Sequence, residues 1–406
     1  MAEYSVQNLD ELLTKYYGQP VKILETKSKM LTAPGENYGS LMLALDVTIA
    51  LRKDQKQLHL VAKLLPKSEF MRGLFDIFVT FKKEIDAYTK AIPALIEFQR
   101  DYGVDNVIDF FGECYGARCS LSNTEKIDED AVILLENLKY EGYDNIDRLV
   151  GFNFEEAELI LKDLAMFHAV PIAFKALKPK EFEKKIGPAI IRHRGIEYAH
   201  PSMIESIYDC LRDHLKIAGF EHLTEKILNI LRNTLHSEQK NKVPPNTPFL
   251  TWIHFDYWVN NTMLLHDKTG KPIKNKMVDL QMIRYDSCTR DLLFVLFTSI
   301  KTEVVKSRYD ELIKIYYDSF IKSLEVFKID LEPYSWVNFL KEIDAYAAYE
   351  LEHILFMLKP IFTIKGSIES MDNLDDNDMN RQDLIGEAFT NKLKDTIEAY
   401  TQRNWL

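Results

Sequence analysis

Two polar clusters in the sequence have a spacing that suits metal-assisted phosphoryl transfer. The segment "HFDYWVNN" places Asp256 and Asn261 five positions apart, directly after an apolar run. The pattern that follows, "TMLL", "HDKTGKPIKNK" and "MVDL", predicts two strands joined by a polar turn. An antiparallel hairpin brings the start of its first strand beside the end of its second, so Asp279 is expected close to Asn261 and Asp256. Two carboxylates and a carboxamide form an oxygen-rich set that suits Mg²⁺.

The order of these three residues is the one that kinases use. An aspartate accepts the proton of the attacking hydroxyl, an asparagine five positions later binds metal, and a second metal-binding aspartate follows a hairpin. Asp256, Asn261 and Asp279 fit that order and spacing.

The N-terminal third of the chain supplies residues that could hold a nucleotide. Lys63 lies in the "VAK" of an apolar strand, where a lysine is unfavourable unless it is paired, and Glu84 on the following helix is its natural partner. A turn-rich segment, "GENYGS", precedes these strands where a phosphate-covering loop is expected. Its candidate nucleotide-binding residues are Gly35, Asn37, Tyr38 and Ser40.

The strands that must position Lys63 are concentrated in the N-terminal third. Alternating apolar residues predict a strand over 41–49, and a polar turn separates it from a second strand over 58–65. Two further strands are expected over 107–119 and 130–138. A small antiparallel sheet is therefore predicted here.

Helices are predicted for most of the remaining chain. Residues 70–98 read as a helix that Pro93 kinks or divides, and the chain looks helical from Asn153 to about Thr234. The strand before His254 and the hairpin interrupt this pattern, and helices resume after residue 290. We expect an α+β fold class with two lobes: a sheet-rich N-terminal lobe over 1–136, where the nucleotide ATP is expected to bind, and a larger, mostly helical lobe over 137–406.

Composition restricts the classes of protein to which the chain can belong. Its 406 residues are 46% hydrophobic and 28% charged, which is a globular composition. The formal net charge of −11 argues against nucleic acid and anionic membranes as partners. The longest apolar run, "LLFVLFTSI", is too short to span a membrane, and the N-terminus has no secretory signal pattern. Four scattered cysteines indicate reduced thiols, so we expect a cytoplasmic protein.

Seven stretches in the same order resemble the ecdysteroid kinase-like family, a branch of the choline-kinase and aminoglycoside-phosphotransferase group. They are "APGENYGS", "LVAKLLP", "FKKEIDAYTKAIP", "VILLENL", "LAMFHA", "HFDYWVNN" and "VDLQMIRYDSCTRDL", from about residue 30 to 300. The resemblance implies a protein-kinase-like fold and an ATP- and Mg²⁺-dependent kinase. Its acceptor would be a hydroxyl of a steroid or another lipophilic metabolite.

The resemblance also implies a role for each matching residue. Asp256 would be the catalytic base, with Asn261 and Asp279 as Mg²⁺ ligands. Lys63 would contact the ATP phosphates, supported by Glu84. Backbone groups of Glu136 and Leu138 would meet the adenine, and Asp291 would brace the catalytic loop. His254 is expected to support that loop rather than to transfer a proton.

Three positions depart from the family pattern. Phe255 stands where a glycine is usual, Asn137 where an aspartate is usual, and Leu280 where an aromatic residue is usual. None of the three removes a proton-accepting or metal-binding group.

Other interpretations of these features remain open. The chain could be a choline- or sugar-type kinase for a polar acceptor, or a catalytically silent binding protein with the same fold. Trp258 and Asn260 could shape the loop or face the acceptor. His168, on an amphipathic helix, is expected to be a core histidine. Asp376, Asp378, Asn380 and Glu387 match a calcium loop in part, but Arg381 stands where such a loop needs glycine, so a solvated acidic loop is expected. The oligomeric state does not follow from the sequence.

Overall fold

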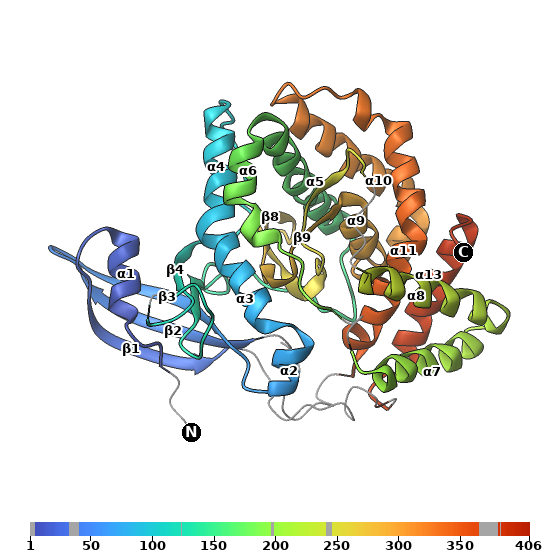
Figure 1. Ribbon diagram of the computed structural model, residues 1–406, viewed down its shortest axis with the longest axis horizontal. Coiled ribbons are helices and arrows are strands. Elements are labelled where there is room, and N and C mark those ends of the chain that lie inside the picture. Colours follow the sequence, from blue (N-terminus) through green and yellow to red (C-terminus); the bar gives the residue numbers. More distant parts are fainter. Residues whose placement is uncertain are drawn as a thin grey trace.

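The computed structural model describes residues 5–31, 40–122, 124–195, 199–240, 246–364, 381 and 383–406. It has a sheet-rich N-terminal lobe and a larger, mostly helical lobe (Figure 1). This is the two-lobed, protein-kinase-like arrangement that the sequence predicts. The predicted boundary after residue 136 falls at the end of the last strand of the sheet, β5 (Val132–Glu136).

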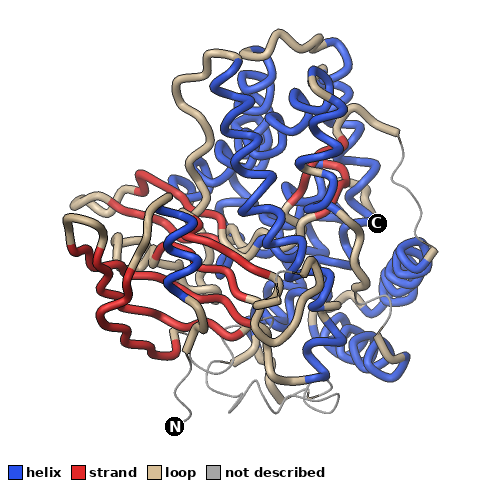
Figure 2. Tube along the Cα trace, turned by 60° about the vertical axis from the view of Figure 1, so that its left-hand side comes forward, coloured by secondary structure: helices blue, strands red, loops and turns tan. Residues whose placement is uncertain are grey.

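Five antiparallel strands form the N-terminal sheet, in the order β1-β2-β3-β5-β4 (Figure 2). The strand alternation gives the sheet two buried faces. One face packs against helix α1 through Leu43, Leu60 and Leu134, whereas Ile133 and Leu135 of β5 face the helices on the other side. The bounds of these elements are α1 (Leu9–Tyr17), β1 (Lys22–Met30), β2 (Leu41–Ala50), β3 (Gln55–Leu64), β4 (Cys114–Arg118) and β5.

The predicted helix over 70–98 is a series of shorter helices. It breaks first at Asp76, whose left-handed backbone (φ 47°) separates two helices. A π-helical turn over Ala87–Ala91 then precedes the last helix, in which Pro93 occupies the first turn because it has no amide hydrogen to donate. The helices are α2 (Glu69–Leu74), α3 (Ile77–Asp86) and α4 (Ile92–Asp101).

Two strand predictions were too long or misplaced. Only Cys114–Arg118 of the predicted strand 107–119 joins the sheet, because Phe110 and Phe111 pair instead with Met277 of the C-terminal hairpin. The second hairpin strand covers Pro272–Met277 rather than 277–280. Its turn is closed early by the Asp267 carboxylate, which accepts hydrogen bonds from the backbone of Thr269 and Lys271. Helix α1 and strand β1 were not predicted.

The C-terminal lobe is built around α5 (Phe154–Leu177), which begins where the sequence predicts. Asn153 and Glu156 form a reciprocal capping box at its start. The helices packed around it form one continuous apolar core, which also takes in α3, α4 and one face of β5. The other elements of the lobe are α6 (Pro179–Lys185), α7 (Pro201–Ile217), α8 (Thr224–Gln239), β6 (Leu250–Ile253), β7 (Thr262–His266), β8 (Pro272–Met277), β9 (Arg284–Ser287), α9 (Cys288–Thr298), α10 (Thr302–Glu325), α11 (Trp336–Phe362) and α13 (Glu387–Gln402).

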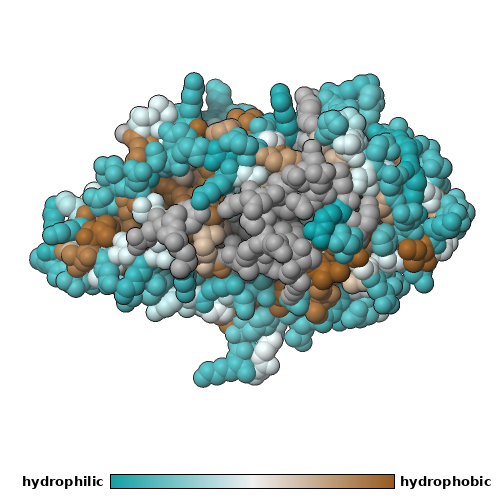
Figure 3. Space-filling model, turned by 90° about the horizontal axis from the view of Figure 1, so that it is seen from below, coloured by the Kyte–Doolittle hydropathy of each residue, from teal (hydrophilic) through white to brown (hydrophobic). Residues whose placement is uncertain are grey.

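Hydrophilic side chains cover much of the face shown in Figure 3, and the apolar side chains on it occur in separate groups. Within the described ranges, no helix is both long and apolar enough to cross a bilayer. The four cysteines are free thiols. Of the residues in the calcium-loop pattern, Asp376, Asp378 and Asn380 lie outside the described residues, and Glu387 is the first residue of α13.

Candidate active site

The residues predicted to bind a nucleotide meet the catalytic hairpin at Lys63. The register of β3 turns Leu60 and Ala62 toward α1, so Lys63 points to the opposite face and is almost fully buried. Its Nζ lies 2.5 Å from Glu84 Oε2 and 2.6 Å from Asp279 Oδ1. Burial by itself lowers the pKa of Lys63, but the charges of Asp279 and Glu84 outweigh it and the pKa rises. Lys63 is therefore protonated, and its ion pair with Asp279 joins the N-terminal lobe to the C-terminal lobe.

Glu84 also holds the backbone beside Asp279. Its second carboxylate oxygen, Oε1, accepts a hydrogen bond of 3.2 Å from the Leu280 amide. Asp279 itself has a left-handed backbone with φ 63°, in the short turn after β8. One helical glutamate thus fixes both the lysine and the loop that carries Asp279.

Asp256 and Asn261 lie in one compact loop between β6 and β7. The Asn261 amide donates 2.8 Å hydrogen bonds to the backbone oxygen and to the Oδ2 atom of Asp256. The Val278 amide donates to the Asn261 carbonyl at 3.0 Å, which places Asp279 next to Asn261. The structure therefore brings Asp256, Asn261 and Asp279 together as the hairpin argument predicts.

Asp291 braces the loop that carries Asp256. Its carboxylate accepts the backbone amides of His254 and Phe255 at 2.7 and 2.8 Å, and it lies 3.1 Å from His168 Nε2. Burial would raise the pKa of Asp291, but the hydrogen bonds that it accepts from His168 and from the His254 amide favour the carboxylate, and the pKa falls below its ordinary value. His168 is fully buried and also contacts the Tyr316 hydroxyl at 2.6 Å, so it is a core histidine as expected.

His254 contacts the backbone on both sides of the site. Its Nε2 lies 3.1 Å from the Val278 carbonyl, and its Nδ1 accepts from the Asp256 amide at 3.3 Å. Burial lowers the pKa of His254, which favours the neutral ring that these two contacts require. These contacts give His254 a supporting position.

The surroundings of Asp256 raise its pKa well above the ordinary carboxyl value. Burial is the largest cause, and the nearby charge of Asp279 adds to it. Hydrogen bonds from the side chains of Asn261 and Trp258 oppose the rise. A carboxylate with a raised pKa is a stronger proton acceptor than an ordinary aspartate.

Lys63, Glu84, Asp256, Asn261 and Asp279 line one cavity of about 720 Å³ between the lobes. One part of the cavity is lined by Lys63, Glu84 and the segment from Leu135 to Lys139. This segment contains Glu136 and Leu138, whose backbone groups are predicted to contact the adenine. Ser40 is buried at the same part of the cavity. Gly35, Asn37 and Tyr38 lie outside the described residues.

Another part of the cavity is walled by helices of the C-terminal lobe. Its apolar side chains come from α8, from the catalytic loop and from one face of α11. They include Leu235, Trp258, Phe356, Met357 and Pro360. Trp258 combines the two roles considered for it, because its side chain hydrogen-bonds Asp256 and also lines the cavity.

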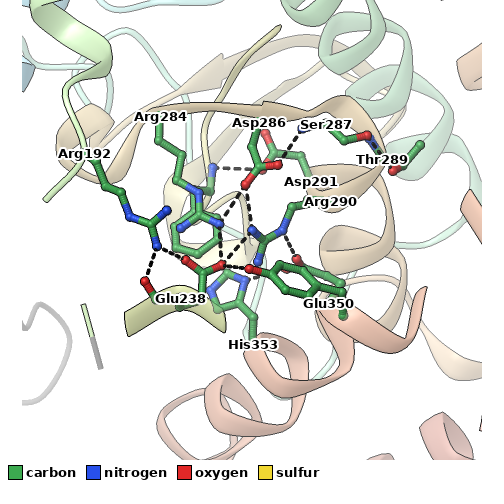
Figure 4. Close-up of polar contacts among 12 residues, drawn as sticks. Arg192, Glu238, Arg284, Asp286, Ser287, Thr289, Arg290, Asp291, Glu350 and His353 are labelled. Atoms are coloured by element: carbon green, nitrogen blue, oxygen red, sulfur yellow. Dashed lines mark hydrogen bonds and ion pairs between the residues drawn. The ribbon is translucent and has the colours of Figure 1, made fainter. Parts of the chain in front are cut away.

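A buried ion network supports this helical wall (Figure 4). Glu238 of α8 accepts from Arg192, Arg284 and Arg290, and Asp286 accepts from Arg284 and Arg290. The sequence did not reveal this network, because Arg284, Asp286 and Arg290 lie in one of the family-like stretches, whereas their partners Glu238 and Glu350 are 46 to 60 positions away. Arg290 of α9 also donates to Glu350 of α11, so the network joins α8, β9, α9 and α11.

Phe255 adopts a conformation that favours glycine, the residue usual at its position in the family pattern. Its φ is 65°, and a left-handed backbone costs a residue with a Cβ about 1–2 kcal/mol. The other two departures, Asn137 and Leu280, do not have a left-handed backbone. Leu280 is fully buried, and the backbone amide of Asn137 donates a 3.0 Å hydrogen bond to the backbone carbonyl of His59.

The donor set fits a magnesium ion that is shared with phosphate groups. No cluster of three or more His, Cys, Asp or Glu side chains within the described part of the chain is arranged to hold a metal. Mg²⁺ in nucleotide sites commonly uses one or two carboxylates and completes its shell with phosphate oxygens and water. Asp279 and Asn261 supply oxygen ligands of this kind beside Asp256.

Comparison with known proteins gives one extended match in sequence. The ecdysteroid kinase-like family matches residues 34–329. No curated protein matches the chain significantly. Similar solved structures include a spectinomycin phosphotransferase in complex with ADP and spectinomycin, with 12% identity, a TM-score of 0.43 and coverage of 97% of this chain and 99% of that one. A choline kinase from Cryptosporidium parvum Iowa II has 12% identity, a TM-score of 0.45 and coverage of 94% and 91%.

Proposed function

Because the chain belongs to the ecdysteroid kinase-like family, we propose that it transfers the γ-phosphate of ATP to a hydroxyl of a steroid or another lipophilic metabolite. ATP and Mg²⁺ are the proposed cofactors, and the small-molecule alcohol is the proposed partner. The observation that carries this proposal is the convergence of Lys63, Asp279 and Asp256 on one cavity between the lobes. The free cysteines are in keeping with a cytoplasmic location.

The residues divide the chemistry among them. Lys63, held by Glu84, would bind the phosphates of the nucleotide, and Asp279 and Asn261 would hold Mg²⁺, which neutralises phosphate charge when bound. Asp256 would accept the proton of the acceptor hydroxyl while the hydroxyl oxygen bonds to the γ-phosphorus and the bond to ADP breaks. The raised pKa of Asp256 suits this role as base.

The charges near the helical wall favour an uncharged acceptor over choline. A cationic acceptor needs a cage of aromatic rings, or of carboxylates that no arginine or lysine already neutralises. Glu238, which lines this part of the cavity, is already paired with Arg192, Arg284 and Arg290. The neighbouring side chains Leu235, Phe356 and Met357 are apolar, which supports a lipophilic acceptor.

ATP turnover with a panel of hydroxyl compounds tests the proposal. Sterols, long-chain alcohols, sugars and choline would be compared by mass spectrometry, together with the shift in melting temperature that ATP produces with and without Mg²⁺. Asp256→Asn should abolish turnover and keep most of the nucleotide-dependent shift. Asp318→Asn is the matched control, because Asp318 is exposed on α10 and pairs only with its neighbour Lys314 among the contacts described.

Three results would contradict the proposal or a part of it. Absence of any Mg²⁺·ATP response and of turnover across the panel would leave a silent binding protein as the better account. Full activity in Asp256→Asn would remove Asp256 as the base, and turnover confined to choline or sugars would exclude the lipophilic acceptor.

A further inference from the structure

Phe255 directly precedes Asp256 and lines the same cavity, and its ring is held on both faces. The guanidinium carbon of Arg284 is 3.5 Å from the ring centroid, and the His353 ring is stacked at 4.3 Å with an interplanar angle of 14°. Two groups this close to one centroid must lie on opposite faces of the ring. Phe255 is therefore sandwiched between an arginine and a histidine.

The two groups that clamp Phe255 are themselves fixed. Arg284 donates to Asp286 at 3.0 Å and to Glu238 at 3.3 Å. On the other face, His353 Nδ1 lies 2.6 Å from Glu350 Oε1 (Figure 4). The His353 ring also stacks on Phe294, with the ring centroids 4.3 Å apart. Because both neighbours are tethered by buried carboxylates, the Phe255 ring cannot swing aside when a ligand enters.

The backbone of Phe255 is held as firmly as its ring. Its amide donates to Asp291 at 2.8 Å in the left-handed conformation that glycine would adopt without strain. The side chain contacts keep a strained residue directly beside the proton acceptor. The ring is also part of the cavity lining, together with Trp258, Arg284 and His353.

Resting on the proposed kinase activity, we propose that Phe255 is a specificity-determining residue, a rigid wall that admits only unhindered hydroxyls to Asp256. A fixed ring next to the base leaves little room for substituents on the carbon that bears the reacting hydroxyl. The acceptor class is therefore a lipophilic alcohol with a primary or an unhindered secondary hydroxyl at one end of its skeleton. The same ring keeps water away from Asp256 and so limits hydrolysis of ATP.

Substitution of Phe255 tests this assignment with simple alcohols as probes. Cyclohexanol and 1-methylcyclohexanol differ by one methyl group on the reacting carbon, and ATP hydrolysis without added alcohol reports on water as the acceptor. In Phe255→Gly, the ratio of kcat/KM for 1-methylcyclohexanol to kcat/KM for cyclohexanol should rise by about tenfold, which is the lower end of the effect of one methylene group in an apolar pocket. ATP hydrolysis should rise several-fold. Phe255→Tyr, which keeps the ring, should retain the wild-type ratio.

Two measurements separate this role from general damage to the loop. Phe320→Leu alters a buried phenylalanine that is not part of the cavity lining, so it should lower stability and leave the acceptor ratio unchanged. If Phe255→Gly lowers kcat/KM for both alcohols equally and does not raise ATP hydrolysis, Phe255 is only structural and the inference is overturned. Absence of Mg²⁺·ATP turnover in the wild-type protein with any alcohol would instead contradict the kinase proposal on which it rests.

Discussion

Replacing Lys63 with methionine should destabilise the protein strongly, because Lys63 neutralises two carboxylates at once. Glu84 is fully buried and the Asp279 side chain is 20% exposed, and both lie within 2.6 Å of Lys63 Nζ. Methionine keeps most of the side-chain volume and removes the charge. Breaking a buried ion pair from one side typically costs about 3–5 kcal/mol, since the remaining charge is left uncompensated. A loss of this size is a large part of the stability of an ordinary domain.

The loss in Lys63→Met should depend on pH with a defined sign. Burial raises the pKa of Glu84, and Lys63 opposes the rise. Without Lys63 the folded-state pKa moves further above that of the unfolded chain, so folded Glu84 takes up a proton that the unfolded chain does not. The stability contributed by this proton is present at low pH and is lost as pH rises through the folded-state pKa. The difference from wild type should therefore be smaller at pH 5 than at pH 8.

Urea unfolding of the wild-type protein and three variants at both pH values checks this reasoning. Lys63→Met combined with Glu84→Gln should recover most of the stability, because both charges of the pair are then gone. Lys314→Met, which breaks an exposed pair on α10, should cost less than about 1 kcal/mol. ATP turnover should remain lost in the double variant, which would separate the role of Lys63 in phosphate binding from its role in stability. Wild-type stability in Lys63→Met, or no recovery in the double variant, would refute the argument.

Three further predictions follow from individual contacts. Asp291→Asn should lower kcat more than it raises KM for ATP, because one of the two oxygens that accept the amides of His254 and Phe255 becomes an NH₂ group. Steady-state kinetics check this prediction, and an unchanged kcat would contradict it. The kcat/KM profile should fall on the acid side at a pH above the ordinary carboxyl range, because Asp256 must be unprotonated to act as base and its pKa is raised in the free enzyme; a fall only near pH 4 would contradict this. Asn153→Ala should lower the free energy of unfolding by about 1 kcal/mol through loss of the cap of α5, as measured by urea unfolding, with no change in KM for ATP.

Local patterns in the sequence predicted that a hairpin follows the loop of Asp256, although its second strand lies at Pro272–Met277 rather than at 277–280. Asp256 and Asn261 are only five positions apart and so lie in one loop. The antiparallel hairpin that follows brings Asp279 back beside this loop, and this return depends on the hairpin alone. The capping box at Asn153 is likewise a local signal, because its two hydrogen bonds span only three residues. Short-range geometry of this kind can be read directly from residue order.

The first and last residues of strands were less predictable, because they depend on pairing with segments that are distant in the sequence. The strand expected over 107–119 loses Phe110 and Phe111 to the hairpin near Met277, and nothing in the local pattern reveals that competing partner. The apolar and alternating character of these residues fits either arrangement.

The sequence alone determined which groups carry the proposed chemistry, since Lys63, Glu84, Asp256, Asn261 and Asp279 can be found from residue type and spacing. Only the tertiary structure decided what surrounds them. Phe255 could be recognised as an unusual residue, but its clamping by Arg284 and His353 depends on β9 and α11, about 30 and 100 positions further along the chain. Contacts across such separations arise from packing of the whole lobe, and no periodicity or motif in the chain encodes them locally.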